Sequence, residues 1–270
     1  MNDDNTNREQ LTEANRKAWN ETAAIHANIT LKALLEGIQK PDYSTLDVIE
    51  EKIFAELGIQ DKAIIQLSCN NGRELLSLKK RGAGRCMGVD ISDDFIAQAR
   101  ELAKVGQLEA EFIRSDVYEL KGYDEAFDIV YITIGALGWL PDLKSYLALI
   151  QRLLRPGGHV FIYEMHPILD MFDPDKALNL QHSYFRTKPY VSSNDPDYMD
   201  PSQRVSETSY WFHHKLSDII GGLAKEGLSL VHFCEYDHDI SEVFKEFAKF
   251  EKRLPMCYSL VAEKTLRQGF

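Results

Sequence analysis

Cysteines and long apolar runs are both scarce in this sequence of 270 residues. Its four cysteines lie far apart without a C-x-x-C pair, which indicates neither a zinc site nor a disulfide framework. No apolar run approaches the roughly 18 residues that a membrane-spanning helix needs, so we expect no membrane span. The first ten residues, MNDDNTNREQ, are polar and acidic and are not typical of a signal peptide. A cytoplasmic location is therefore expected.

Basic residues are also in the minority. The chain has 31 Lys and Arg against 42 Asp and Glu, which gives a formal net charge of −11. Nucleic-acid binding draws much of its affinity from basic side chains on phosphates, so this balance disfavours a nucleic-acid partner. The remaining composition, 44% hydrophobic and 27% charged, is ordinary for a globular protein. The length suits one domain with a large core.

The most informative stretch runs from Ala63 to Asp90. A short apolar run, Ala63 to Leu67, predicts a buried strand, and the small residues of Ser68 to Gly72 predict a tight turn. A helix with leucines on its inner side follows, and then a second strand, Cys86 to Val89, which Asp90 closes. Such a unit leaves free N–H groups at the helix start and places a carboxylate where it can bind a ribose diol. A nucleoside-cofactor site is therefore expected, and an ordinary βαβ unit with a solvated acid is the alternative.

Glycine is missing where a dinucleotide site would need it. The fingerprint G-x-G-x-x-G aligns with Ser68, Asn70 and Gly72, so only its last glycine is present. A pyrophosphate needs the close backbone approach that those glycines permit. A nicotinamide-dependent oxidoreductase is therefore disfavoured.

This loop resembles motif I of the class I S-adenosylmethionine-dependent methyltransferases, in which Gln66 would replace the usual acid. Three further motifs follow in the order that the family has. Asp116 and Val117 match its adenine-binding pair, Phe127 to Thr133 matches motif IV, and a Pro-Gly-Gly turn at residues 156–158 precedes the expected fifth strand, His159 to Tyr163. The cofactor residues that the resemblance implies are Trp19, Gln66, Ser68, Cys69, Asn70, Gly72, Asp90, Ile91, Asp116, Val117 and Thr133.

The resemblance implies an α/β, Rossmann-like, doubly wound fold: a mostly parallel seven-stranded sheet with an antiparallel C-terminal hairpin. We expect a single domain with N-terminal lid helices (residues 1–58), a cofactor-binding core (63–166), a substrate-side insertion after the fifth strand (167–212) and the rest of the sheet (213–270). The insertion, rich in proline and tyrosine, either covers the substrate or only shields the sheet.

Helical spacing predicts the flanking helices. The first covers residues 7 to 37; its Trp19 and His26 match the lid position of the family, although Trp19 could equally be a packing anchor. A second helix, capped by Ser44 with Asp47 three residues on, should end at Gly58. The last part predicts a helix over 216–226, a strand over 228–235, a short helix over 241–250 and a final strand over 256–263.

The family's reaction is an in-line transfer of a methyl group from S-adenosylmethionine, with S-adenosylhomocysteine as the product. A general base helps a hydroxyl or amine acceptor, and His166, directly after the fifth strand, is the first candidate; a strand-capping role is the alternative. Trp139, Glu164 and His213 are expected to contact a small-molecule acceptor. No metal is expected, because Asp170 and the nearby acids match no known metal loop. A degenerate fold that binds without catalysis is the second hypothesis; the acceptor and the oligomeric state are not determined by the sequence.

Overall fold

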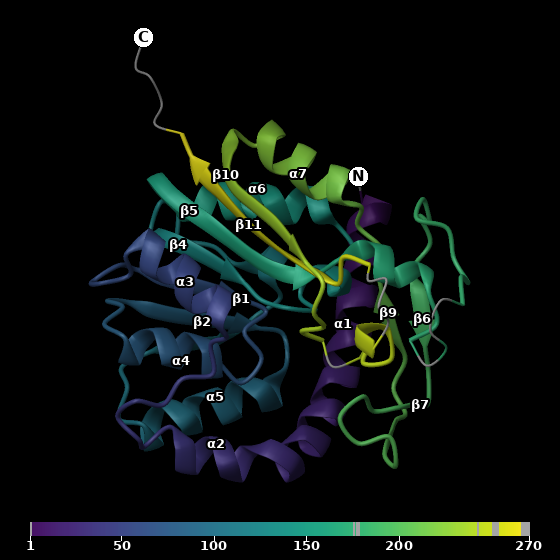
Figure 1. Ribbon diagram of the computed structural model, residues 1–270, viewed down its shortest axis with the longest axis horizontal. Helices are drawn as coiled ribbons and strands as arrows, with labels where there is room; N and C mark the ends of the chain where they lie inside the picture. The colour runs from purple at the N-terminus through teal and green to yellow at the C-terminus, as the bar shows by residue number, and fades with distance from the viewer. Residues whose placement is uncertain (1, 175, 177–178, 242, 250–253, 266–270) are drawn as a thin grey trace.

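The computed structural model describes residues 2–174, 176, 179–241, 243–249 and 254–265. Its centre is a seven-stranded sheet in the order β10-β11-β5-β4-β1-β2-β3 (Figure 1). The strands are β1 Ile64–Leu67, β2 Cys86–Asp90, β3 Glu111–Arg114, β4 Phe127–Ile132, β5 Leu154–Met165, β10 Leu228–Tyr236 and β11 Cys257–Lys264.

Strand direction confirms the predicted topology. The pairs among β1 to β5 are parallel, whereas β11 runs antiparallel to both β5 and β10. The order reverses between β1 and β4, and the ligand crevice of such sheets is expected at the carboxyl ends of these central strands. The mostly parallel sheet with an antiparallel C-terminal hairpin is therefore present as expected.

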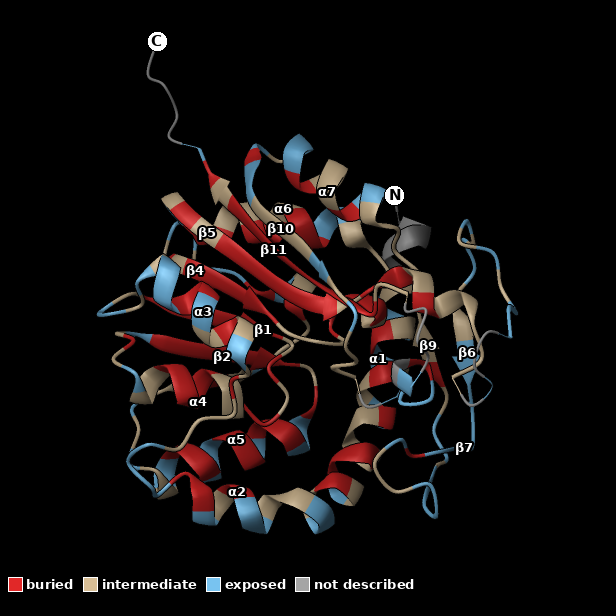
Figure 2. Ribbon diagram, viewed as in Figure 1, coloured by how far each residue is buried: buried red, intermediate tan, exposed pale blue. Residues whose placement is uncertain are grey.

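Helices cover both faces of the sheet, and this explains why its central strands are buried along almost their whole length (Figure 2). One face packs on α6 and α7, and the other on α3, α4 and α5. These helices are α3 Val48–Leu57, α4 Arg73–Lys80, α5 Asp93–Val105, α6 Leu143–Leu153 and α7 Leu216–Lys225. All four residues of β1 and all five of β2 are buried.

The N-terminal segment is helical almost from its start. Helix α1 spans Asn2–His26 and continues through a π-helical turn, Ala27–Leu31, into α2, Lys32–Gly37. The predicted helix over residues 7–37 is confirmed, with an earlier start. Figure 1 shows α1 crossing the end of the sheet where β1 and β2 terminate.

The predicted cap of α3 is wrong. Asp47, not Ser44, is the N-cap: its carboxylate accepts hydrogen bonds from the N–H groups of Ile49 and Glu50 at 2.8 and 2.9 Å. Glu50 in turn accepts the N–H of Asp47 at 2.8 Å, which completes a capping box. Ser44 lies outside the helix, where its hydroxyl accepts the N–H of Leu46. Gly58 ends the helix in the left-handed conformation, as expected.

Two other boundaries also differ from prediction. Strand β5 starts at Leu154 rather than His159, because Leu154 pairs with Phe127 before the register shifts across the glycine turn. The expected helix over 241–250 is absent from the described part of that segment, which contains only the 3-10 turn Phe247–Lys249; residues 242 and 250 lie outside the described residues. The helix and strands predicted at 216–226, 228–235 and 256–263 are found.

The insertion after β5 is a set of short elements. These are the 3-10 helix Pro167–Met171, β6 Tyr190–Ser192, β7 Asp195–Pro196, β8 Arg204–Val205 and β9 Ser209–Trp211. The two pairs, β6 with β9 and β7 with β8, are antiparallel. The segment lies against the N-terminal helix: Asn15 bonds the backbone of Tyr210 through both its amide atoms, at 2.7 and 3.0 Å. The N-terminal helix and the insertion therefore form one covering layer.

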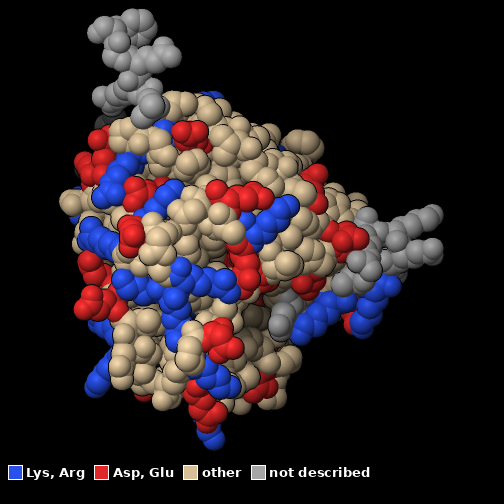
Figure 3. Space-filling view, turned by 60° about the vertical axis from the view of Figure 1, so that its left-hand side comes forward, with Lys and Arg blue, Asp and Glu red and all other residues tan. Residues whose placement is uncertain are grey.

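The hydropathy of the described helices and the mixed charge of the visible surface are those that the composition indicates. None of the described helices combines the length and the apolar character that a bilayer crossing requires. On the face in Figure 3, Lys and Arg side chains are interspersed with Asp and Glu side chains. All four cysteines are free thiols.

Candidate active site

The turn after β1 has a backbone that few side chains tolerate. Ser68, Asn70 and Gly72 all have positive φ, at 55°, 51° and 70°. A β-carbon on Gly72 would lie 2.4 Å from the ring of Phe112, so only glycine fits there. Gly72 is also the N-cap of α4, so the turn leads directly into the start of this helix, whose first N–H groups lack helical partners.

Asp90 joins this turn to the end of β2. One carboxylate oxygen accepts the N–H of Asn70 at 2.7 Å, and the other accepts the N–H of Ser92 at 2.9 Å. Burial raises the pKa of Asp90, while the N–H groups of Ser92, Asn70 and Ile91 act in the opposite direction. The side chain, only 9% exposed, is thus fixed beside the turn with lone pairs left for further donors.

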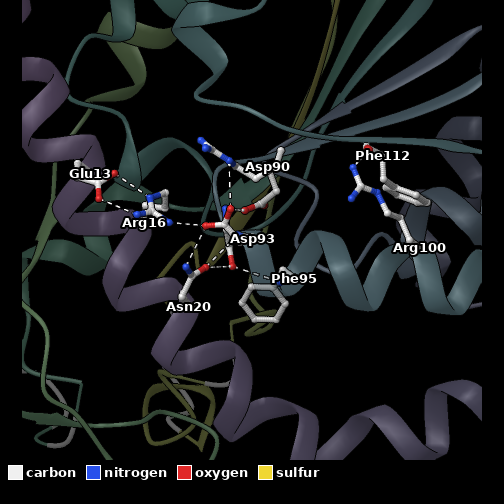
Figure 4. Close-up of polar contacts among 10 residues, drawn as sticks. Glu13, Arg16, Asn20, Asp90, Asp93, Phe95, Arg100 and Phe112 are labelled. Atoms are coloured by element: carbon white, nitrogen blue, oxygen red, sulfur yellow. Dashed lines mark hydrogen bonds and ion pairs between the residues drawn. The ribbon is translucent and has the colours of Figure 1, made fainter.

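Helix α1 is anchored to the same corner (Figure 4). The amide oxygen of Asn20 accepts hydrogen bonds from the Ser92 hydroxyl at 2.7 Å and from the N–H of Asp93 at 3.0 Å. Asp93 also forms ion pairs with Arg16, from α1, and with Arg114, at the end of β3. The sequence pattern did not indicate Arg16 and Asn20, because contacts between segments more than seventy residues apart leave no local pattern.

All three tryptophans of the chain form one row beside this corner. The Trp19 ring lies 5.8 Å from Phe95 and 5.1 Å from Trp139, and Trp139 lies 5.1 Å from Trp211, each edge to face. The row joins α1, the loop after β4 and β9. Both expectations for Trp19 are compatible with this place, since it packs against neighbours at the mouth of the crevice.

The other residues expected at the cofactor differ in how far their polar groups already have hydrogen-bond partners. Asp116 caps a 3-10 turn by accepting the N–H of Tyr118 at 3.0 Å, and Val117 is buried. The Gln66 amide nitrogen donates to the Thr133 hydroxyl at 3.4 Å, while its buried amide oxygen has no partner among the described residues. Cys69 differs: its thiol is fully buried, with a raised pKa, and its N–H donates to Val89.

Comparisons with known proteins agree with this geometry. Residues 64–158 match the family model described as a methyltransferase domain. The core of the chain is a class I methyltransferase domain. A demethylmenaquinone methyltransferase of Thermus thermophilus is 34% identical over 107 residues, which is 39% of this chain and 48% of the relative. The chain therefore spans about half the length of that curated relative.

Solved structures support the same fold over more of the chain. An S-adenosylmethionine-dependent methyltransferase of Mesorhizobium loti is 19% identical, with a TM-score of 0.56 over 85% of this chain and 99% of its own. One from Methanosarcina mazei is 17% identical, with a TM-score of 0.59 over 80% and 98%. At these identities the likeness concerns the fold.

His166, the expected base of the methyltransferase domain, has no free ring nitrogen. Its Nε2 lies 2.9 Å from the Glu235 carboxylate, and its Nδ1 accepts the N–H of Ile168 at 3.1 Å. The ring is 5% exposed, and burial lowers its pKa. This geometry is that of a capping histidine, since the ring caps the 3-10 helix Pro167–Met171 directly after β5.

Glu164 organises the loop that follows β4. Its buried carboxylate accepts the N–H groups of Gly135 at 2.6 Å, Met165 at 2.7 Å and Leu137 at 3.1 Å. Burial raises its pKa to about 7, against the effect of these hydrogen bonds. The side chain therefore fixes the start of the loop after β4 against the end of β5.

His213 lies at the end of the insertion, beside Trp211. Its Nδ1 is 2.9 Å from one oxygen of Asp170, and the Trp211 indole N–H donates to the other oxygen at 3.1 Å. Asp170 is thus occupied by two side chains. Among the described residues no group of three or more His, Cys, Asp or Glu side chains is arranged to hold a metal ion.

Proposed function

We propose that this protein transfers a methyl group from S-adenosylmethionine to a small-molecule acceptor. The observation that carries the proposal is the fixed position of Asp90, which accepts the Asn70 N–H at 2.7 Å and so places a ribose acceptor directly beside the bare turn at the end of β1. Curated relatives named as a demethylmenaquinone methyltransferase and a sterol 24-C-methyltransferase support it.

The residues around the crevice fit that cofactor. Ser68 and Asn70 keep the left-handed backbone of the turn although they are not glycine. Without those glycines the turn lacks the close backbone approach that a pyrophosphate needs, so it suits a ligand without phosphate. The buried, unpartnered oxygen of Gln66 is an acceptor at the same edge, and an ammonium or amide group of a ligand would satisfy it. Asp90 would bind the ribose, and the region of Asp116 and Val117 the adenine.

When bound, S-adenosylmethionine supplies an activated methyl group on a positively charged sulfur. The chain's contribution is to hold the acceptor in line and to exclude water, and orientation of this kind supplies on the order of 7–11 kcal/mol of a barrier. The ring face of Trp19 or Trp139 would attract this cation, a contact of roughly 0.5–2 kcal/mol. The anchored α1 and the insertion would close the crevice.

A turnover screen tests the proposal. The protein is incubated with S-adenosylmethionine and pools of small phenols, amines and thiols, and S-adenosylhomocysteine release is measured by mass spectrometry together with the methylated acceptor. The proposal expects release with at least one pool, and its loss in Asp90→Ala. Tight binding of the cofactor without turnover in any pool would favour a binding module instead. A cytoplasmic location and the domain limits given above remain predictions.

A further inference from the structure

The Asp170–His213 pair, at the end of the insertion, has the arrangement of an acid–base dyad. The Asp170 carboxylate lies 2.9 Å from His213 Nδ1, and its other oxygen is held by the Trp211 indole at 3.1 Å. The Tyr184 ring packs edge-on against the imidazole, with centroids 5.1 Å apart. A carboxylate on Nδ1 fixes the tautomer in which the proton sits on Nδ1 and Nε2 is a free base.

That free nitrogen is buried without a partner. The His213 side chain is 1% exposed, and Nε2 forms no hydrogen bond with any described residue. Buried polar atoms in native proteins nearly always have a partner, so an orphan of this kind points to a missing ligand. Among the eight histidines of the chain, His213 differs in this respect from His166, whose two nitrogens are both engaged.

His213 lines a cavity of about 220 Å³. A cavity of roughly 150 Å³ accepts benzene, so this one has room for a single aromatic ring with substituents. Side chains from the insertion and from the start of α7 form its walls. The lining side chains include Phe185, Arg186, Phe212, His213, Lys215 and Asp218.

The walls carry an excess of positive charge. Lys215 is paired with Asp218 at 3.2 Å. Arg186 forms no ion pair with any described residue: its guanidinium donates to the backbone carbonyls of Lys188 and Pro189. A carboxylate on the ligand would supply the missing counter-charge, in the bidentate geometry that arginine favours.

The cavity adjoins the loop after β4 that carries Trp139. The N–H of Phe212 donates to the Gly138 carbonyl at 2.6 Å, and His214 lies 2.9 Å from the Leu140 carbonyl. The segment that presents His213 is therefore fixed on the same loop as Trp139, which stands between Trp19 and Trp211 in the aromatic row.

We propose that Asp170 and His213 form the general-base pair of this enzyme, and that the acceptor is a ring-sized hydroxy acid, such as a phenol that bears a carboxylate. The inference rests on the proposed methyl transfer. A bond forms between the acceptor oxygen and the methyl carbon as the bond from that carbon to the sulfonium sulfur breaks. The acceptor's hydroxyl proton moves to His213 Nε2, the sulfur leaves as a neutral thioether, and Asp170 stabilises the imidazolium.

A spectroscopic probe tests the pair without turnover. The probe is 4-hydroxy-3-nitrobenzoate, which carries a carboxylate and a phenol whose ionised form absorbs visible light. It is titrated into the 270-residue chain at a pH where the free phenol is mostly protonated. We expect binding with a gain of phenolate absorption, because His213 takes the proton. Cofactor binding is assessed separately, by titration with S-adenosylhomocysteine.

Variants separate the base from the fold. His213→Asn keeps a donor for Asp170 but has no basic nitrogen, and should bind the probe about tenfold more weakly, without phenolate gain. Asp170→Asn should retain binding with a smaller gain. Arg186→Met should weaken the probe but not 2-nitrophenol, which lacks the carboxylate. His159→Asn, within β5 and not among the residues that line the cavity, is the matched control and should behave as wild type.

Each result decides the proposal. Absence of probe binding in wild type, or an unchanged phenolate signal in His213→Asn, would overturn the pair. If the wild-type protein also binds S-adenosylhomocysteine, the cofactor proposal would survive that result. The converse, a normal probe response without any S-adenosylhomocysteine binding, would overturn the methyl transfer and leave a hydroxy-acid site.

Discussion

Trp211 lies directly against Gly138: a β-carbon built on this glycine would lie 2.2 Å from the indole ring. The contact holds the last strand of the insertion on the loop that follows β4. It also sets the edge-to-face packing of Trp211 on Trp139 and the hydrogen bond from the indole to Asp170. The absence of a side chain at Gly138 thus determines how the insertion packs on the loop after β4.

Gly138→Ala should therefore displace Trp211. We expect a loss of about 1–3 kcal/mol in the free energy of unfolding, the usual cost of overpacking, and a shift in tryptophan emission. Denaturant titration followed by fluorescence measures both. Gly221→Ala is the matched control, because nothing lies within 4 Å of a β-carbon there. That change should be neutral or stabilising in helix α7. Equal effects of the two substitutions would contradict this view of the contact.

The cap of α3 gives a second prediction. Asp47→Ala removes the acceptor of two N–H groups and of the Tyr163 hydroxyl at 2.7 Å, so it should cost about 0.5–2 kcal/mol. Ser44→Ala should cost clearly less, since Ser44 caps no helix. Thermal and denaturant unfolding of both variants would test this order. A larger loss for Ser44→Ala would restore the cap that the sequence pattern predicts.

Glu164 should make stability depend on pH. Its pKa is about 7 in the folded protein against 4.5 as the ordinary value, so between these values the folded state holds a proton that the unfolded state has lost. The free energy of unfolding should therefore fall as pH rises from about 4.5 to 7, by at most about 3 kcal/mol from this group. Glu50, with the same direction of shift, adds to the slope.

Glu164→Gln should flatten that slope, because the amide does not ionise, while the contribution of Glu50 stays. Denaturant titrations at several pH values measure the difference from wild type. Glu36→Gln, on the exposed face of α2, should leave the slope as it is. A wild-type slope in Glu164→Gln would show that this carboxyl ionises normally in the folded protein.

The tip of the insertion is fastened to α1 by a buried contact. His26 Nε2 lies 3.1 Å from the Asp197 carboxylate, and both side chains are buried. His26→Ala should release the β7–β8 hairpin and speed tryptic cleavage after the exposed Arg204 by roughly fivefold or more. Lys17→Ala, on the exposed face of α1, should have no such effect. Equal cleavage rates would mean that other contacts hold the hairpin.

Much of the fold could be predicted because its pattern is local. The apolar runs of β1 and β4 and the leucines of α4 are all visible in neighbouring residues. The start of β5 at Leu154 could not be predicted in this way, since it depends on pairing with Phe127 across the sheet. The same holds for the contacts of α1: Asn20 reaches Ser92 over 72 positions.

The site residues also divide into those that the local sequence indicates and those whose state depends on distant contacts. The turn at Ser68 to Gly72 and Asp90 belong to one compact unit, so their order along the chain already indicated their proximity. The state of a histidine does not follow from its position. Glu235 engages His166 from a strand far along the sequence, whereas His213 retains a free nitrogen. Only three-dimensional contacts distinguish the two rings.

The most direct test of the account is calorimetric titration with S-adenosylhomocysteine, on wild type, Asp90→Ala and Asp94→Ala. Asp94 is an exposed neighbour on α5 and serves as the matched control. We expect binding to wild type and Asp94→Ala, at least about tenfold weaker binding to Asp90→Ala, and no binding of NADH to wild type. Equal affinity in all three proteins would remove Asp90 from the site and contradict the central claim.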